Sequence, residues 1–442
     1  ETDQLGDIIT KFDQSNKKGF NFGFLRQSSF GSQSNYRNLY FGIDNNHPDI
    51  SWVEKATKLG DETNIWSLAV YNGKLYGGTS PNGKLYEWNG TNAWVEKATK
   101  LGDETGIRSL AVYNGKLYGG TNPNSKLYEW NGTNAWVEKA PKAGGTEDYI
   151  LSLAVYNGRL YGGTVPHGKL YEWNGTNAWV EKASKLGDET EIRSLAVYNG
   201  KLYGGTSPNG KLYEWNGTDA WVEKATKLGD ETIIRSLAVY NGKLYGGTGS
   251  KNGKLYEWNG TNAWVEKATK LGVETEIKSL AVYNGKLYGG TYPNGKLYEW
   301  NGTDAWVEKA SKLGDETEIR SLAVYNGKLY GGTVSNGKLY EWKTGVSISY
   351  DYQFSNGWQH VAVVREATSL KMYVNGVLVN TSGAFTQGDY DLSNTNNLLI
   401  GFGQQDFFNG TIDEVRLWNV ARTADEINEN MYRELTGSET GL

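Results

Sequence analysis

Five basic and two aromatic residues recur near the start of one predicted strand in successive copies of a repeated unit. They are Trp66, Arg108, Tyr149, Arg193, Arg235, Lys278 and Arg320. A guanidinium group makes planar, bidentate contacts with a carboxylate or a sulfate, and an aromatic ring can stack on the face of a sugar. These side chains together predict a surface that binds an acidic or sulfated glycan.

The same bases also have a purely structural interpretation. Most copies of the unit carry an Asp-Glu-Thr segment just before this strand, as at Asp188–Thr190. Each base could pair with an acid of its own segment, and exposed ion pairs of this kind are common and contribute little stability. The sequence leaves both interpretations open.

Catalytic chemistry finds little support among the other residues. The three histidines, His47, His167 and His360, lie far apart in the sequence, so they do not indicate a metal site or a catalytic triad. The chain has no cysteine, which excludes disulfides and thiol catalysis. Glutamates equivalent to Glu54 and Glu87 recur in every copy, which suggests a role in the scaffold and not a unique pair of catalytic carboxylates.

Asn-Gly-Thr triplets match the acceptor sequence for N-glycosylation, and so does Asn380-Thr381-Ser382. The candidate asparagines are Asn89, Asn131, Asn174, Asn216, Asn259, Asn301, Asn380 and Asn409. Most of these triplets are also explained by the conformation of a tight turn alone. Glycosylation would further require export of the protein.

A repeat of about 42 residues positions all of these candidates. Its first residues, Trp-Val-Glu-Lys-Ala, occur seven times, beginning at Trp52, Trp94, Trp136, Trp179, Trp221, Trp264 and Trp306. A fixed period of this length is typical of repeat architectures. Most of the 17 tryptophans and 30 tyrosines belong to the repeat, so we expect them to pack between units.

Each unit contains four short predicted strands. In one copy they are Ile192–Tyr198, Lys201–Thr206, Lys211–Trp215 and Trp221–Ala225. Asn199-Gly200 joins the first two, and Asn-Gly between alternating apolar runs is a strong hairpin signal. Four antiparallel strands per unit predict the blade of a β-propeller, and no segment has the length and period of a helix.

The two ends of the array predict how the ring closes. The first copy begins with a fourth strand, Trp52–Ala56, and the last copy ends after its third strand at Trp342. Pairing these two ends gives seven complete blades and leaves no unpaired edge at the seam. We therefore predict an all-β protein whose residues 52–342 form a seven-bladed β-propeller.

Differences among the copies are confined to two places, which are the loop between the second and third strands and the entry to the first strand. In a four-stranded blade these two places lie on the same side of the disc. The variation therefore marks one face of the propeller as the predicted binding surface.

The remaining residues and the composition add further limits. Residues 1–51 and 343–442 do not match the repeat, but several runs in them predict further strands. They include Gly19–Leu25, Asn38–Ile43, Leu398–Phe402 and Thr411–Trp418. Thr423–Glu426 is a capping box that predicts the start of a short helix, and Gly437 its end. The net charge of −5 is mild and not arranged in blocks, which argues against a nucleic-acid partner. No apolar stretch is long enough for a transmembrane helix, and no signal peptide is recognisable.

Three segments after the repeat carry a resemblance to a known family. They are Trp358–Val364, Leu370–Gly376 and Phe408–Asn419, followed by Ala424–Ile427. Their order and spacing resemble the laminin G-like, concanavalin A-like jelly roll of secreted proteins, and Ile8–Asp13 and Gly19–Leu25 resemble its middle strands. The resemblance implies a jelly roll in two parts, residues 1–51 and 343–442, with the propeller inserted between them. The propeller itself resembles kelch-like bacterial propellers in its Asn-Gly-Lys-Leu-Tyr-Gly-Gly-Thr segment.

The resemblance carries further expectations. In related jelly rolls the residue equivalent to Asp413 can hold a structural Ca²⁺, and carboxylate and carbonyl oxygens suit that ion; alternatively, Asp413 caps a turn. The first strands of the family are missing before Glu1, which implies a fragment, or a jelly roll completed by another chain.

Together these features predict an extracellular or cell-surface, non-enzymatic module that binds glycan or a surface protein in adhesion. A second hypothesis is a structural subunit of a surface layer or filament, with homo-oligomers. A third is a polysaccharide-active enzyme, which the near-identity of the blades disfavours because catalysis needs one asymmetric site whereas multivalent binding needs equivalent ones.

Overall fold

The structure is a computed structural model. It describes residues 6–13, 18–29, 32–45, 50–57, 59–99, 101–184, 186–226, 228–269, 271–311, 313–343, 345–351, 357–403, 407–408 and 410–442. Within these ranges the regular structure is nearly all strand, and α1 (Ala424–Asn430) is the one α-helix. Two short 3₁₀ turns, η1 (Ala143–Gly145) and η2 (Gln387–Asp389), complete the elements. The predicted all-β class is confirmed.

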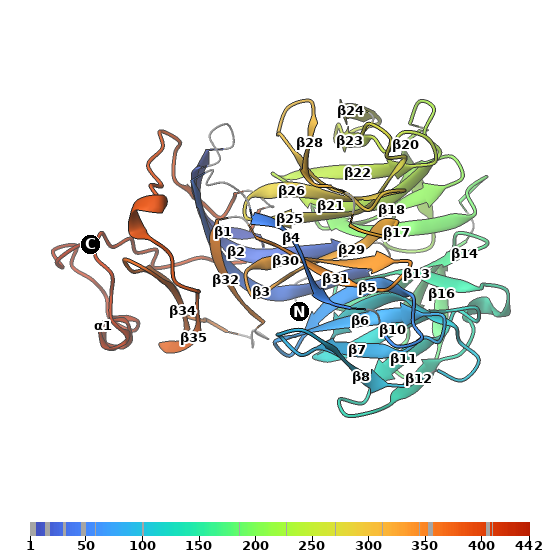
Figure 1. Ribbon diagram of the computed structural model, residues 1–442, viewed down its shortest axis with the longest axis horizontal. Helices are drawn as coiled ribbons and strands as arrows, with labels where there is room; N and C mark the ends of the chain where they lie inside the picture. Colours follow the sequence, from blue (N-terminus) through green and yellow to red (C-terminus); the bar gives the residue numbers. More distant parts are fainter. Residues whose placement is uncertain are drawn as a thin grey trace.

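The repeated units form four-stranded antiparallel blades, numbered 1 to 7 by their first strands (Figure 1). The first strands are β5 (Asn64–Tyr71), β9 (Gly106–Tyr113), β13 (Tyr149–Tyr156), β17 (Glu191–Tyr198), β21 (Ile233–Tyr240), β25 (Glu276–Tyr283) and β29 (Glu318–Tyr325). The second strands are β6 (Lys74–Ser80), β10 (Lys116–Asn122), β14 (Arg159–Val165), β18 (Lys201–Ser207), β22 (Lys243–Gly249), β26 (Lys286–Tyr292) and β30 (Lys328–Val334).

The outer two strands are shorter than the inner two in blades 1 to 6. The third strands are β7 (Leu85–Trp88), β11 (Leu127–Trp130), β15 (Leu170–Trp173), β19 (Leu212–Trp215), β23 (Leu255–Trp258), β27 (Leu297–Trp300) and β31 (Leu339–Lys343). The fourth strands are β8 (Trp94–Ala98), β12 (Trp136–Ala140), β16 (Trp179–Ala183), β20 (Trp221–Ala225), β24 (Trp264–Ala268), β28 (Trp306–Ala310) and, for blade 7, β4 (Ile50–Ala56).

The hairpin turns follow from the Asn-Gly pairs. In blade 4, Asn199 and Gly200 have φ angles of +46° and +69°. Both values lie in the left-handed region, as a type I′ turn requires, and its twist matches that of the strands it joins. The turn brings Tyr198 opposite Lys201 and fixes the register of β17 against β18.

The seam of the ring closes as predicted. β4, at the start of the array, pairs antiparallel with β31, at its end, with Leu339 opposite Ala56 and Tyr340 opposite Glu54. The first strands of neighbouring blades lie side by side in a closed series that runs from β5 to β29 and returns to β5. The innermost strands therefore surround a central axis.

Side chains from adjacent blades fill the space between them. Tyr71 and Tyr76 of blade 1 pack their rings against Trp130 of blade 2, with ring centroids 5.8 and 5.1 Å apart. The second glycine of each Gly-Gly-Thr permits this close approach, because a Cβ on Gly205 would lie 2.6 Å from Cγ2 of Ile234 in the next blade. The expectation that the repeated aromatics pack between blades is confirmed.

A long hairpin from outside the repeat occupies the axis of the propeller. β2 (Lys18–Ser29) pairs with β3 (Ser32–Asn45), and both strands run along the innermost strands of the blades (Figure 1). β2 contacts β21, β25 and β29, whereas β3 contacts β5, β9, β13 and β17, so the hairpin touches the first strand of every blade. Ser32 pairs in parallel with Leu153 near the middle of β13.

The same hairpin belongs to the sheet that lies outside the propeller. β1 (Asp7–Asp13) pairs with β2 and with β36 (Leu399–Ile400), and β32 (Val346–Asp351) pairs with β3. A separate sheet consists of β33 (Val361–Arg365), β34 (Leu370–Val374) and β35 (Val377–Thr381). Phe22, Phe41, Ile348 and Met372 form a common core between the two sheets.

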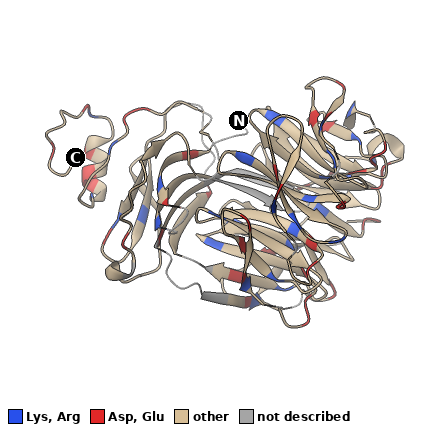
Figure 2. Cartoon of the chain, turned by 90° about the horizontal axis from the view of Figure 1, so that it is seen from above, with Lys and Arg blue, Asp and Glu red and all other residues tan. Residues whose placement is uncertain are grey.

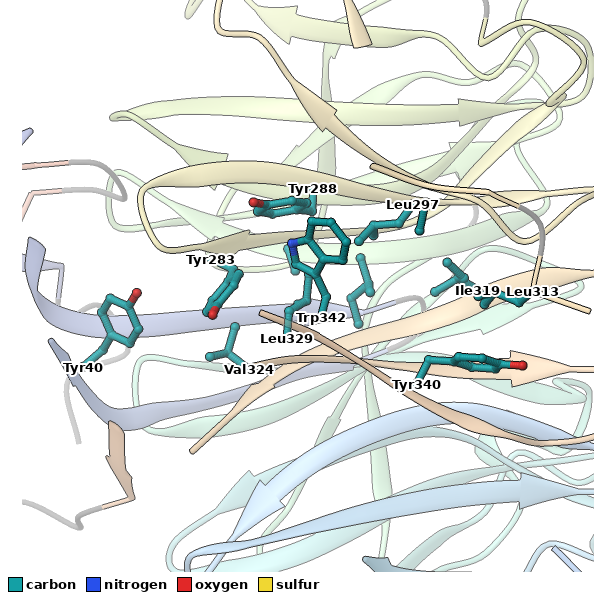
Figure 3. Packing of buried hydrophobic residues seen from close by; sticks show 13 residues of the cluster. Tyr40, Tyr283, Tyr288, Leu297, Leu313, Ile319, Val324, Leu329, Tyr340 and Trp342 are labelled. Atoms are coloured by element: carbon teal, nitrogen blue, oxygen red, sulfur yellow. The ribbon is translucent and has the colours of Figure 1, made fainter. Parts of the chain in front are cut away.

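A buried polar network joins this outer domain to blade 6. The Tyr40 hydroxyl donates to Asn284 Oδ1 at 2.9 Å, and Asn284 Nδ2 donates to Asp44 Oδ2 at 3.3 Å. Lys286 Nζ lies 3.0 Å from the same Asp44 oxygen, and both side chains are almost completely buried. Figure 3 shows Tyr40 beside Tyr283, within a cluster that extends to the Trp342 ring of blade 7.

Some of the strands expected after the repeat are shorter or absent. The predicted strand at Leu398–Phe402 is reduced to β36, and the described residues of Thr411–Trp418 form no strand. The capping box is present, since Thr423 and Glu426 exchange hydrogen bonds, but α1 ends at Asn430 and not at Gly437. Among the described residues, β36 pairs with β1 alone, through Ile9 opposite Ile400 and Thr10 opposite Leu399.

Candidate functional site

The varying positions lie on the face of the propeller that the outer domain does not contact. The outer domain touches the turns between first and second strands, where Gly73 N donates to Asp351 and Gly327 N donates to Ser349. The entries to the first strands lie at the opposite end of the same strands. This face, here called the free face, contains the mouth of the channel that the β2–β3 hairpin occupies from the other side.

Six of the seven predicted site residues occupy the same unusual backbone position. In blade 4, Ile192 pairs with Thr206 and Ser194 with Gly205, so Arg193 has no partner residue on β18. The register shifts at the same place beside Trp66, Arg108, Arg235, Lys278 and Arg320. A β-bulge redirects the side chain of the extra residue. Because all six residues lie in bulges around one axis, their side chains gather at the mouth.

Tyr149 lies apart from this set because it is the first residue of β13, and Leu151 occupies the bulge of blade 3. The ring of Tyr149 nevertheless contacts the same cluster, with its centroid 5.1 Å from the Arg108 guanidinium carbon. The structure thus brings all seven predicted residues to one mouth. The alternation of apolar and polar residues that predicted the strands did not predict the β-bulges.

Ion pairs within blades and between neighbouring blades engage four of the five bases. Arg193 pairs with Glu191, which lies two residues before it. Arg235 Nε lies 2.7 Å from Glu276 Oε2 of the next blade. The chain of charges continues through Lys278, whose Nζ is 2.7 Å from Glu276 and 3.0 Å from Glu318, and ends at Arg320.

These partners differ from the ones that the sequence suggested. The glutamates of the Asp-Glu-Thr segments are fully buried and bind the loops between second and third strands. Glu104 Oε1, for example, accepts from Asn124 Nδ2 at 2.8 Å, and Glu316 Oε1 accepts from Asn336 Nδ2 at 2.8 Å. The bases pair instead with glutamates at the entries to the first strands, which is one of the two places where the copies differ. The sequence did not indicate these glutamates as partners.

Burial weakens the charged state of the bases at the mouth. It lowers the pKa of Arg320 to about 9 and the pKa of Arg193 to about 10, although nearby carboxylates oppose the change. Burial also raises the pKa of Glu318, but the charges of Arg320 and Lys278 outweigh it, so that the pKa is lowered. All these groups remain ionised near neutral pH, and the mouth is a desolvated network of charges.

Trp66 is enclosed between two guanidinium groups. The guanidinium carbons of Arg108 and Arg320 lie 3.7 and 4.0 Å from its ring centroid. Two groups so close to one centroid must lie on opposite faces, because they would overlap on the same face. Both faces of Trp66 are therefore covered by cations, so its part in the expected sugar stacking is replaced by cation–π contacts.

Charge elsewhere on the propeller is balanced locally. Lys and Arg are interspersed with Asp and Glu over the blades (Figure 2). On the free face, Lys84 lies 3.0 Å from Asp61, and Lys254 lies 3.6 Å from Asp230.

The sequon asparagines of the blades shape their own turns. Asn89 Oδ1 accepts hydrogen bonds from the backbone N–H groups of Thr91, Asn92 and Ala93 at 2.8 to 3.1 Å. The turns of Asn131, Asn174, Asn216, Asn259 and Asn301 have the same bonds. Asn380 donates to the Ser349 carbonyl, and Asn409 lies outside the described residues. These turns need their asparagines for structure, whether or not they are glycosylated.

In the described part of the chain, metal-binding groups are not gathered around Asp413. Its side chain is exposed, and Oδ1 accepts from the Glu414 backbone N–H at 2.8 Å, as expected if it caps a turn. Across the described part of the chain, no group of three or more His, Cys, Asp or Glu side chains is placed to share a metal ion. The described residues therefore do not by themselves fit a carboxylate-lined calcium site. His167 contacts Glu147 at 2.8 Å, and His47 lies outside the described residues.

A protein-family model described as the concanavalin A-like lectin/glucanases superfamily, of the laminin G type, matches residues 299–428. The match includes β33, β34, β35 and α1, and it begins inside blade 6, where the strands pair as propeller. It supports a concanavalin A-like domain joined to the propeller. No curated protein matches the chain significantly.

Solved β-propellers resemble the repeat region. The WD40 propeller domain of Doa1 aligns with a TM-score of 0.50 and 14% identity, covering 66% of this chain and 97% of its own. YCF48, solved with a D1 peptide, gives 0.51 and 15%, covering 67% and 97%. Virginiamycin B lyase from Staphylococcus aureus gives 0.51 and 11%, covering 66% and 99%. At these identities the likeness shows a propeller fold alone. Among the described residues, no helix is long and apolar enough to span a membrane.

Proposed function

We propose that this chain is an extracellular or cell-surface, non-enzymatic adhesion module whose seven-bladed propeller binds glycan or a surface protein on its free face. The main observation is the position of the varying residues. Positions that differ among otherwise near-identical blades gather on this face, whereas the outer domain contacts the opposite face. A scaffold under no demand for recognition has no reason to vary on one face only. The match to a lectin-type family model also supports a binding function.

The arrangement of the mouth also supports a binding role. Four of its bases are held by carboxylates in fixed ion pairs, which suits a rigid recognition surface. The likeness to virginiamycin B lyase concerns the fold, at 11% identity. Because blades 1 to 3 differ from blades 4 to 7 at the mouth, we propose a single asymmetric site and not seven equivalent ones.

A glycan array probed with the intact chain at low and high salt tests this function. Tyr292 is 37% exposed at the end of β26, on the free face, so Tyr292→Ala should weaken binding. Val222→Ala, which changes a side chain 44% exposed on the outer strand β20, serves as the control. Equal binding by both variants would place the ligand elsewhere, and the absence of any glycan or cell-surface ligand would contradict the proposal.

A second candidate function is a structural subunit of a surface layer or filament. This function is supported by exposed large apolar side chains among the described residues of 357–442. They include Trp358, Val377, Ile400, Phe407, Leu417 and Tyr432. We propose that another chain, or a further segment that completes the jelly roll, covers part of this surface. Self-association at micromolar concentration without any ligand, measured by sedimentation, would favour this function, and a monomer would count against it.

Calcium at Asp413 stays a prediction. Such an ion would need ligands beyond the side chains described around this residue. A rise in thermal stability with added calcium that Asp413→Asn abolishes would support it.

A further inference from the structure

Arg108 differs from every other base at the mouth. Its Nε donates to Asn122 Oδ1 at 2.7 Å, and Asn122 is neutral. No carboxylate among the described residues lies within 4 Å of its guanidinium group. Neither terminal nitrogen makes a hydrogen bond within the described chain, and neither belongs to the fully buried unpaired atoms. Two N–H groups of one guanidinium edge are therefore free to bind.

Arg108 lacks a carboxylate partner because blades 1 and 2 have no acidic residue at the entry to the first strand. Blades 4, 6 and 7 place Glu191, Glu276 and Glu318 at the strand entry, whereas blades 1 and 2 place Asn64 and Gly106 there. The mouth thus holds five bases and three carboxylates, and the bases exceed the acids by two. Three carboxylates face four bases in blades 4 to 7, so one of the two surplus bases lies there and the other is Arg108, which has no carboxylate in its own sector.

Neighbouring rings fix the position of Arg108. Its guanidinium lies 3.7 Å from the Trp66 centroid and 5.1 Å from that of Tyr149, and Arg320 covers the other face of Trp66. Trp66 Nε1 in turn donates to Ser80 Oγ. A cation held in one orientation before binding loses less entropy when it binds a ligand. Burial also lowers the pKa of Arg108 to about 10, so a bound anion would relieve an unfavourable environment.

We propose that Arg108 binds an oxyanion group of the ligand, a carboxylate or a sulfate, through the two N–H groups of its free edge. This inference rests on the proposed binding function of the free face and assigns its ligand class. A planar guanidinium edge matches the two oxygens of a carboxylate or a sulfate. The aromatic rings fix the position of Arg108, and the other four bases belong to blades 4 to 7.

Calorimetric titration of the intact chain tests the site with three probes: sodium sulfate, sodium glucuronate and a sulfated oligosaccharide. Arg108→Gln removes both the positive charge and the bidentate N–H edge of the guanidinium. We expect it to weaken binding about tenfold or more. Arg193→Gln removes the same charge from the same repeat position in blade 4, where Glu191 already pairs with it, and should change affinity less than about threefold. Stronger binding of glucuronate than of sulfate would identify a carboxylate ligand, and the reverse order a sulfate.

Arg108→Lys keeps the charge but loses the bidentate edge, so it should bind with intermediate affinity if Arg108→Gln fails to fold. Equal losses in Arg108→Gln and Arg193→Gln would overturn the site, because they would show general attraction to a positive mouth. Binding of neutral glycans without any affinity for the three anions would overturn it as well, yet leave the proposed function intact. Failure to bind any ligand would remove both.

Discussion

At the residue scale, one repeated lysine has two different environments. Lys243 in blade 5 is half exposed and lies 2.9 Å from Glu257, which is a pairing found in most blades. Lys286 occupies the same position in blade 6, where the outer domain covers it and brings Asp44 to 3.0 Å. The same residue type is therefore a surface group in one blade and part of a buried interdomain ion pair in another.

This contrast predicts unequal effects of the same substitution. Lys286→Met should destabilise the protein by about 3 kcal/mol, because it removes a buried cation that lies 3.0 Å from the buried carboxylate of Asp44. Lys243→Met should cost less than about 1 kcal/mol, since the pair it breaks is exposed to solvent. Urea unfolding of both variants measures the difference. Similar midpoints for the two variants would mean that Asp44 is not buried against blade 6.

The pH dependence of anion binding tests the charge of the mouth, to which Arg108 contributes together with Arg320 and Arg193, whose pKa values are lowered to about 9 and about 10. Sulfate keeps its charge between pH 6 and pH 11, so any change in its affinity reports on the protein. The pKa of Arg108 is lowered to about 10 by burial and by Arg193, while Tyr149 and Glu318 oppose the change. Affinity should be constant up to pH 8 and fall as pH rises through about 10, with about a tenfold loss at pH 11. A flat profile in a protein whose circular dichroism is unchanged would contradict the assignment.

The sequence predicted which residues gather at the mouth but not how they pair. Repetition identified Arg193 and Arg235 as equivalent, and strand direction placed them on one face. The β-bulge, the ion pairs with Glu276 and Glu318 and the sandwich around Trp66 depend on contacts between blades. Such contacts join residues about 40 positions apart, beyond the range of any local sequence pattern.

At the element scale, the β2–β3 hairpin serves two domains. Its base pairs with β1 and β32, and its distal part lies against the first strands of the blades. The strand patterns of Gly19–Leu25 and Asn38–Ile43 were visible in the sequence. The sequence did not indicate that these strands lie along the axis of the propeller, because the pattern of a hairpin is the same whether it faces solvent or a ring of strands.

Shortening the hairpin tests its role in the propeller. Replacing residues 26–37 by Asn-Gly keeps Leu25 opposite Asn38 and supplies a type I′ turn, while it removes the part that reaches Leu153. The amides of β5, β9 and β13 should then exchange with solvent about tenfold faster or more, because their inner side loses its packing partner. Exchange in the outer strands β8 and β12 provides the internal control. Unchanged exchange in the first strands would show that the ring of blades is stable without the hairpin.

At the scale of the whole molecule, the sequence predicted the architecture better than the connection between its parts. The period of the repeat, the Asn-Gly turns and the orphan strand at Trp52–Ala56 were enough to predict the closed array, and β4 pairs with β31 accordingly. The resemblance of the flanks to a concanavalin A-like domain agrees with the family match. Neither source indicated that the outer domain enters the propeller, since insertion in sequence does not specify insertion in space.

This connection predicts that the two domains unfold together. The hairpin, the Lys286–Asp44 pair and the Tyr40–Asn284 hydrogen bond all cross the boundary, so opening one domain exposes buried groups of the other. Pulsed hydrogen exchange along a urea gradient should give one midpoint for peptides from β33 and β34 and for peptides from β5 and β9. In the shortened-hairpin variant combined with Lys286→Met, the two sets of peptides should separate. Separate midpoints in the unaltered chain would show instead that the domains are independent, and the free face would then be displayed on a mobile partner and not on a rigid one.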